Sequence, residues 1–245
     1  MHPMPGWIFT TLEGWAIVLG VLVAAVGALY LLRRWISGSW NPFETLESRL
    51  LEVVPKAIGA LKVKQPVCSL RLYYYDTHAP GDDYGVDLRL LSADRRTALV
   101  AAHGRDAPFY LWAAGEEACD GPSTNLGAHP GLGRLFRRVY RIMSDADEEE
   151  EVVAQLRDVL QRVSMRLNAA DWSSVCPVTD DFVVATADGS QVFADDFEDL
   201  ERSIPTARLD LLRARGLLGP DGDNWARVEL PGNSEPDASA GQPRE

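Results

Sequence analysis

Cysteine is scarce in this sequence. The 245 residues include three cysteines, Cys68, Cys119 and Cys176, which are far apart and form no C-x-x-C pair. An odd number of widely spaced cysteines argues against a disulfide framework and against a zinc site built on cysteine. Because free thiols persist in reducing surroundings, this usage favours a domain in the cytoplasm.

Basic charge is also in short supply. Lysine occurs only at Lys56, Lys62 and Lys64, and the formal net charge of the chain is −12. A protein that binds nucleic acid through its surface needs a basic footprint. The charge balance therefore excludes a general nucleic-acid binder, and it disfavours broad contact with anionic lipid headgroups.

Recognisable catalytic motifs are missing. The patterns Gly-x-Ser-x-Gly, His-Glu-x-x-His, Ser-x-x-Lys and the phosphate-binding P-loop do not occur, and the histidines are His2, His78, His103 and His129. We therefore expect no enzyme and no cofactor. A membrane-tethered hydrolase is an alternative, because a catalytic triad is defined by its geometry and not by the order of its residues.

One long apolar stretch stands out among what is present. Trp15–Leu32 reads WAIVLGVLVAAVGALYLL and contains no charge and no proline. As a helix rising about 1.5 Å per residue it would span roughly 27 Å, close to the ~30 Å hydrocarbon core of a bilayer. A helix also satisfies its own backbone polar groups in lipid. We predict a transmembrane helix over residues 15–35, with the lipid bilayer as its surroundings.

The residues at the two ends of this stretch predict its orientation. Arg33 and Arg34 follow it, whereas residues 1–14 contain Glu13 and no lysine or arginine. The positive-inside rule then places residues 1–14 outside and the C-terminal domain in the cytoplasm, as a single-pass protein of the plasma (inner) membrane. The alternative is a cleaved signal peptide, but the positively charged region with which such peptides begin is absent here.

Small residues recur at every fourth position of the apolar stretch, on one helix face. They are Ala16, Gly20, Ala24 and Ala28. Stripes of small residues let two membrane helices approach closely. The stripe predicts a homodimer formed through the transmembrane helix. The alternative is that alanine and glycine are simply frequent in such helices.

Beyond the anchor, the chain is predicted to form a connector at residues 36–41, one globular domain at 42–218 and a disordered tail at 219–245. The domain of about 180 residues is long enough to bury a sizeable core. Alternating, aromatic and β-branched residues predict strands at 67–75, 86–90, 108–113 and 181–187. Helical spacing of apolar residues predicts helices at 42–61, 92–104, 132–143, 144–167, 195–202 and 205–215. Strands mixed with helices, with an antiparallel hairpin at 67–90, indicate an α+β sandwich.

Several local signals refine this prediction. Pro55 should kink or split the first helix, because proline cannot donate to the helical hydrogen-bond ladder. Ser92 should cap the second helix, and Ser144 with Asp147 predicts a capping box before another. Apolar residues point to both sides of the strand at 181–187, so we expect both of its sides to be covered.

Acidic residues and one imidazole gather in the turn-rich loop between the two hairpin strands. They are Asp76, His78, Asp82 and Asp83. Carboxylate oxygens together with a histidine can hold a divalent metal ion, so the loop is a candidate metal site. The spacing matches no specific metal motif, and the alternative is an ordinary polar hairpin tip.

Four arginines share one face of the helix at 132–143, opposite its apolar stripe. They are Arg134, Arg137, Arg138 and Arg141. This arginine face could contact lipid headgroups or an acidic partner. The acidic run DADEEEE at residues 145–151 lies close by, and we expect it to neutralise the arginines within the chain.

The order of segments carries a resemblance. A helix precedes LRLYYYD and an acidic hairpin, and then come FYLW, a long helix, DDFVVATADGS and SIPTARLDLL. From Phe43 to Gly216 this layout resembles uncharacterised bacterial immunity-type domains, which are associated with polymorphic toxins. The resemblance implies a protein-binding role without catalysis and carries over no site residue. We therefore expect a membrane-anchored, non-enzymatic cytoplasmic domain that binds an unknown protein partner. Besides the hydrolase, the alternative is a lipid or nucleotide sensor.

Overall fold

The structure is a computed structural model that describes residues 19–29, 41–74, 85–112, 118–145, 149–189, 196–220 and 226–228. The chain divides into two compact units, residues 1–41 and residues 42–245. In the first unit, residues 19–29 are helical. None of the helices described is both long enough and apolar enough to cross a membrane. The span predicted at residues 15–35 extends past 19–29 at both ends, where it lies outside the described residues.

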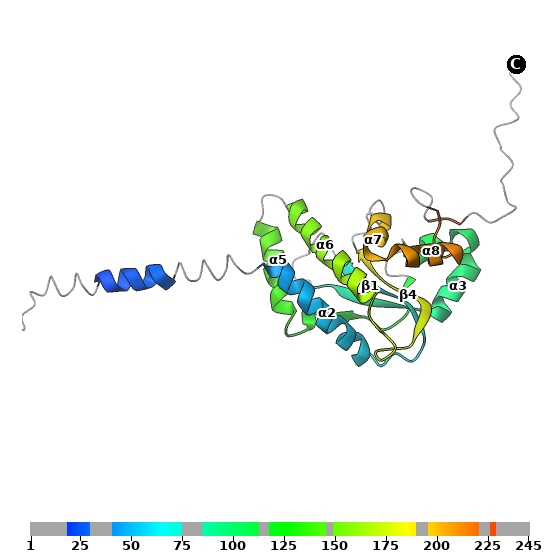
Figure 1. The fold of residues 1–245 in the computed structure, drawn as a ribbon, viewed down its shortest axis with the longest axis horizontal. Coiled ribbons are helices and arrows are strands. Elements are labelled where there is room, and N and C mark those ends of the chain that lie inside the picture. The colour runs from blue at the N-terminus through cyan, green and yellow to red at the C-terminus, as the bar shows by residue number, and fades with distance from the viewer. Residues whose placement is uncertain are drawn as a thin grey trace, which may run out of the picture. The chain divides into compact units, whose positions relative to one another are not determined.

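A mixed four-stranded sheet forms the centre of the second unit (Figure 1). Its strands are β1 (Val67–Tyr74), β2 (Asp87–Ser92), β3 (Thr124–Asn125) and β4 (Val178–Asp188), in the spatial order β3-β2-β1-β4. β1 pairs antiparallel with β2 and parallel with β4. The α+β class and the predicted antiparallel hairpin are therefore confirmed.

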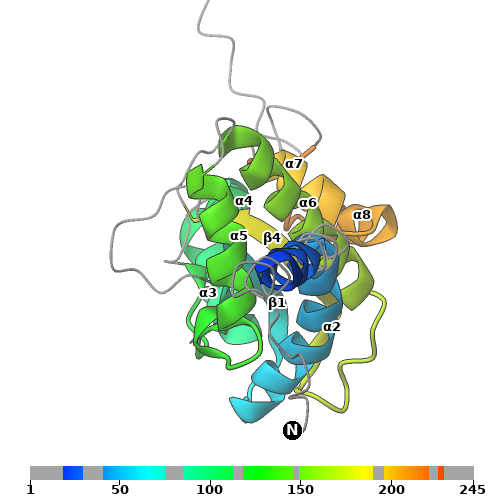
Figure 2. The same ribbon diagram turned by 90° about the vertical axis from the view of Figure 1, so that its left-hand side faces the viewer.

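Helices cover both faces of this sheet. The first face packs against α2 (Pro42–Ala60), α5 (Gly133–Asp145) and α6 (Glu149–Leu167). Figure 2 looks onto this layer, with α2 and α5 in front of the strands. The second face packs against α3 (Ala93–His103), α4 (Ala107–Trp112), α7 (Asp196–Ser203) and α8 (Thr206–Ala214). Each face buries a core of its own.

β4 shows how one strand serves both cores. Phe182 and Val184 belong to the first core, and Val183 and Ala185 belong to the second. Since successive side chains of a strand point to opposite faces, an unbroken apolar run is required when both faces are covered. The predicted coverage of this strand on both sides is confirmed.

The ends of two helices match their sequence signals. The Ser92 hydroxyl accepts a hydrogen bond from the backbone N–H of Arg95 and so caps α3, which ends at Gly104. Gly216, just beyond α8, has a φ of +68°. A left-handed backbone at this position favours glycine and stops a helix.

Two predictions on the segment between α3 and α5 are wrong. Residues 108–113 were predicted as a strand from their aromatic content, but α4 covers most of them. Pro108, Leu111 and Trp112 are buried at helical spacing, so packing overrides a weak strand propensity. Thr124 and Asn125, where the sequence predicts no strand, form β3, which pairs with β2.

At two further positions, Pro55 and Ser144, the helices differ from the prediction. Pro55 does not split α2, which continues to Ala60. Proline removes only one donor from the ladder, and buried Val54 and Ile58 on either side keep the helix packed. Ser144 lies inside α5 and not at the start of α6, while its predicted capping partner Asp147 lies outside the described residues.

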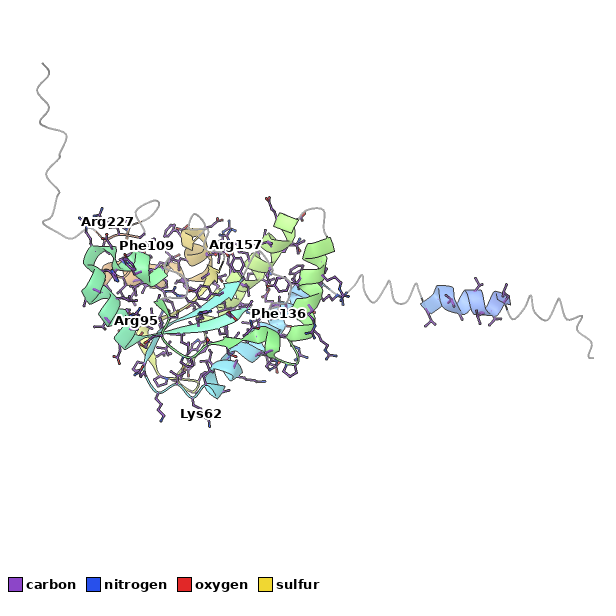
Figure 3. The ribbon with its side chains drawn as sticks, turned by 180° about the vertical axis from the view of Figure 1, so that it is seen from behind. Lys62, Arg95, Phe109, Phe136, Arg157 and Arg227 are labelled. Carbon is purple, nitrogen blue, oxygen red and sulfur yellow. The ribbon has the colours of Figure 1, made fainter. Side chains whose placement is uncertain are left out.

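Part of the predicted tail contacts the domain. The backbone N–H of Phe109 donates to the Ala226 carbonyl at 3.1 Å, and that of Val228 donates to the Arg105 carbonyl at 2.8 Å. Figure 3 shows Phe109 and Arg227 at the same end of the domain. The segment at 226–228 thus lies against α4, and residues 229–245 lie outside the described residues.

Candidate functional site

The predicted metal ligands cannot be placed in the fold. Asp76, His78, Asp82 and Asp83 all lie outside the described residues. Within the part of the chain that is described, no group of three histidine, cysteine, aspartate or glutamate side chains is arranged to hold a metal ion. The metal site in the hairpin loop stays a prediction.

The small-residue stripe is only partly described. Gly20, Ala24 and Ala28 belong to the helical segment 19–29, and Ala16 lies outside the described residues. A Cβ atom built on Gly20 would meet nothing within 4 Å. Self-association through this stripe stays a prediction.

The arginine face lies on α5. Arg134, Arg137 and Arg141 are exposed, and Arg138 is half-buried. The opposite side of the helix enters the first core through Leu132, Leu135, Phe136, Val139 and Tyr140. Arg134 and Arg137 form no ion pair with the residues that the structure describes, and their expected acidic partners lie partly outside these residues. Neutralisation by residues 145–151 stays a prediction.

Cys68 and His103 are held in structural contacts. The Cys68 thiol donates to the Leu91 carbonyl at 3.3 Å, and burial raises the pKa of Cys68 to about 11. His103 stacks on Tyr110 with ring centroids 3.5 Å apart. A thiol kept neutral by burial is a poor nucleophile, so Cys68 is suited to packing and not to covalent catalysis.

An unexpected polar cluster lies on the central strand, on the side that faces the second core. Arg71 is 1% exposed and donates from Nη1 to the Tyr73 hydroxyl at 3.1 Å. Its guanidinium lies over the Trp112 ring of α4, 5.2 Å from the ring centroid. Nε and Nη2 of Arg71 have no hydrogen-bond partner among the described residues. Two donors of a buried charged group are therefore unsatisfied, which is rare in folded proteins.

A second arginine adds to the positive charge of this cluster. Arg89 of β2 lies directly opposite Arg71 in the strand register. It lies 5.6 Å from the centroid of the Tyr73 ring and 3.7 Å from the Asp87 carboxylate. Like charges directly opposite each other on paired strands destabilise a sheet. Two arginines therefore lie side by side on neighbouring strands, and Asp87 is the carboxylate that the described contacts place beside Arg89.

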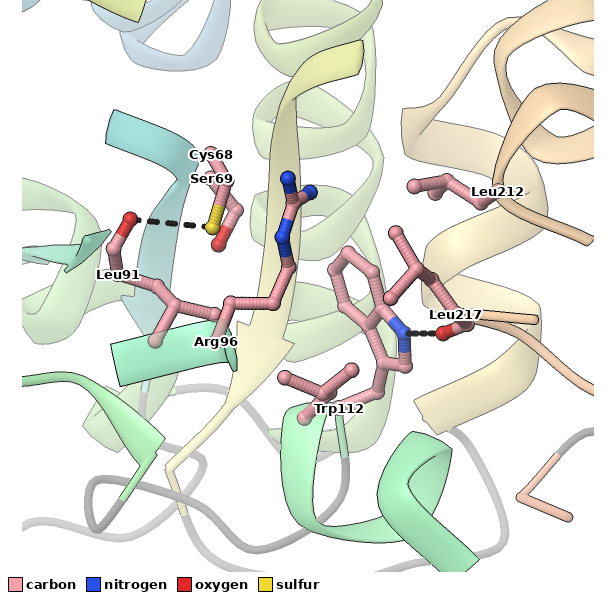
Figure 4. Close-up of a pocket in the computed structure, with 8 residues that line it drawn as sticks. Cys68, Ser69, Leu91, Arg96, Trp112, Leu212 and Leu217 are labelled. Atoms are coloured by element: carbon pink, nitrogen blue, oxygen red, sulfur yellow. Dashed lines mark hydrogen bonds between the residues drawn. The ribbon is translucent and has the colours of Figure 1, made fainter. Parts of the chain in front are cut away.

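A small cavity adjoins the cluster between β1 and the helices α3, α4 and α8 (Figure 4). Ser69, Arg96, Trp112 and Leu217 line part of its wall. The Ser69 hydroxyl is buried and has no partner among the residues described. A volume of about 10 Å³ is open to a water-sized sphere, which is room for about one water molecule. The wall of the cavity is mostly apolar, and the Ser69 hydroxyl is an unsatisfied polar group on it.

The other buried charges near this cavity are paired. The Asp181 carboxylate lies 2.9 Å from Arg96 of α3 and 2.8 Å from Arg215, which follows α8. Burial alone would raise the pKa of Asp181, but hydrogen bonds from Thr179, Arg96 and Arg215 outweigh burial and lower it. These bonds tie both helices to the start of β4 and fix one wall of the cavity.

The sequence predicts β1, but it does not predict the polar cluster around Arg71. The run VCSLRLYYY predicts β1, and no site is predicted at Ser69 or Arg71, which fall on alternate positions of it. One signal was present, since a charged residue lies inside an otherwise apolar strand. That no carboxylate of the described residues pairs with Arg71 depends on which distant segments pack over the strand, and the sequence does not show this.

Comparison of the chain with protein-family models, with curated proteins and with solved structures gives no match. The resemblance to immunity-type domains therefore stays a prediction.

Proposed function

We propose that this chain is a single-pass membrane protein whose globular domain, residues 42–218, binds a partner in the cytoplasm. One observation carries the proposal. The large apolar side chains of the helix at 19–29 are 59–66% exposed, namely Leu19, Val21, Leu22, Val23, Val26 and Leu29. Exposed apolar surface of this extent is unfavourable in water, but it is favourable in a bilayer.

Membrane extraction tests the anchor. We expect the full-length chain to stay with the membrane fraction after an alkaline wash. Replacing Leu22 and Val23 by arginine should release it, because an arginine near the centre of a membrane helix costs about 2.5–3.5 kcal/mol on insertion scales. The matched control, Leu22→Ile with Val23→Leu, should stay in the membrane. Release of the unmodified chain by the wash would overturn the proposal.

The binding role is supported by the resemblance to immunity-type domains and by the state of the possible nucleophiles. Cys68 and Cys176 are buried, and burial raises the pKa of each thiol. A domain that recognises a protein needs surface complementarity and no activated nucleophile. The test is affinity capture of the full-length protein from its own cells in detergent, followed by reconstitution of the complex from the two purified proteins.

A further inference from the structure

Arg71 keeps its positive charge inside the domain, because arginine is not deprotonated in proteins. The nearby carboxylates of β2 and β4 are engaged elsewhere. Asp87 accepts a hydrogen bond from Asn125 at 2.7 Å and lies against Arg89, and Asp181 pairs with Arg96. No carboxylate of the described residues pairs with Arg71, and a buried charge without a counter-charge is strongly unfavourable. A negative group from outside the chain would remove this cost.

The shape of the unsatisfied guanidinium edge of Arg71 indicates which kind of negative group would bind there. Nη1 donates to Tyr73, and the two atoms without partners are Nε and Nη2. Nε–H and one Nη2–H point in the same direction from one edge of the planar guanidinium. This edge holds a carboxylate or a phosphate through two parallel hydrogen bonds. We propose that the Nε–Nη2 edge of Arg71 binds one oxyanion, a carboxylate or phosphate group, between β1 and α4.

The neighbours of Arg71 suit such a ligand. Arg89 lies opposite it and adds positive charge, and Ser69 has an unpartnered hydroxyl two residues away on the same face of β1. Trp112 covers the guanidinium from the α4 side and is 8% exposed. Because the site is closed, it accepts a free anion or a terminal group of a small molecule, and it excludes a macromolecule.

The adjoining cavity has room for about one water molecule, so both access and space for an oxyanion require α4 to move. This helix has six residues and is held by the hydrogen bond from Trp112 Nε1 to the Leu217 carbonyl, 2.7 Å long. Opening one short element costs less free energy than unfolding the whole core. We therefore expect slow exchange of the oxyanion. The inference concerns the interior of the domain and does not depend on the membrane anchor.

Equilibrium dialysis with labelled phosphate and labelled acetate tests the inference on the full-length protein in detergent micelles. Thermal melts are the second measurement. They are run at constant ionic strength, with chloride replacing each oxyanion in the reference samples. We expect about one oxyanion per chain and a Tm that rises with oxyanion concentration, because a ligand that binds only the folded state stabilises it. Arg71→Lys keeps the charge but loses the two-atom edge, and it should weaken binding at least about tenfold.

Arg157→Met is the matched control. Arg157 also points inward, but it is paired with Asp199 at 2.7 Å (labelled in Figure 3), so its loss should lower the Tm and leave oxyanion binding intact. Arg71→Met should abolish binding, and if this variant does not fold, Arg71→Lys decides. Binding of both anions, or of phosphate alone, supports the site and separates a general oxyanion from a phosphoryl ligand. Absence of binding by the unmodified chain, or unchanged binding by Arg71→Lys, would overturn it.

Discussion

At the scale of single residues, the buried charged side chains differ in how many hydrogen bonds they form. Asp181 and Asp199 are 1% and 0% exposed, and each accepts hydrogen bonds from three side chains. Arg71 is equally buried and has one hydrogen bond, to Tyr73. The first two residues tie helices to the sheet, and this explains their burial. The burial of Arg71 is explained by a ligand.

Asp181→Asn tests the structural role of these carboxylates through pH. The folded-state pKa of Asp181 lies below its ordinary value, so its contribution to stability is present above about pH 4 and is lost as pH falls through the folded pKa. We expect the variant to lower the free energy of unfolding at pH 7 by about 1–3 kcal/mol, because Arg96 loses its counter-charge. Urea unfolding between pH 7 and pH 2 measures this difference.

The difference between the two proteins should shrink toward zero at the acid end. Asp180 has its pKa lowered to about 2 by the hydrogen bond from Arg215. Because Arg215 pairs with both carboxylates, the titration of Asp180 differs between the two proteins near pH 2, and the comparison is read above that range. A difference that stays constant down to pH 2 would show that the Asp181 charge is irrelevant.

At the scale of elements, long periodic patterns were predictable from the sequence and short segments were not. α5 repeats its apolar positions at helical spacing, and β1 and β4 are long runs rich in β-branched or aromatic residues, so the type of each follows from the sequence. α4 has six residues, and its aromatic content favours a strand until Trp112 is packed against α8. β3 has two residues and exists only because β2 lies beside it. Tertiary packing decides segments of this length, and the site at Arg71 depends on one of them.

The arginine face of α5 supplies a prediction at this scale. If Arg137 and Arg141 serve mainly as partners for the acidic run 145–151, reversing both to glutamate should be functionally mild. Exposed ion pairs contribute only about 0–1 kcal/mol each, so the Tm should change little. Thermal melts and binding to the captured partner and to anionic liposomes measure the outcome. Loss of partner or liposome binding in a folded double variant would instead identify this face as a docking surface.

At the scale of the whole molecule, the chain combines an apolar helix with a domain of the opposite character. The first unit exposes leucine and valine side chains, whereas the chain as a whole carries a net charge of −12. The second unit buries two cores on either side of its sheet and has no need of the first to complete them. We propose that the apolar helix is an anchor, and an anchor joined to a self-contained domain would hold a binding surface at a membrane.

Topology mapping tests this central claim most directly. Two reporters are fused in turn after Glu245, one that is active only in the cytoplasm and one that is active only outside it. Arg33 and Arg34 follow the predicted span, so we expect the cytoplasmic reporter to be active and the other to be silent. Activity of the external reporter, or recovery of the fusion in the soluble fraction, would contradict a membrane-anchored domain in the cytoplasm.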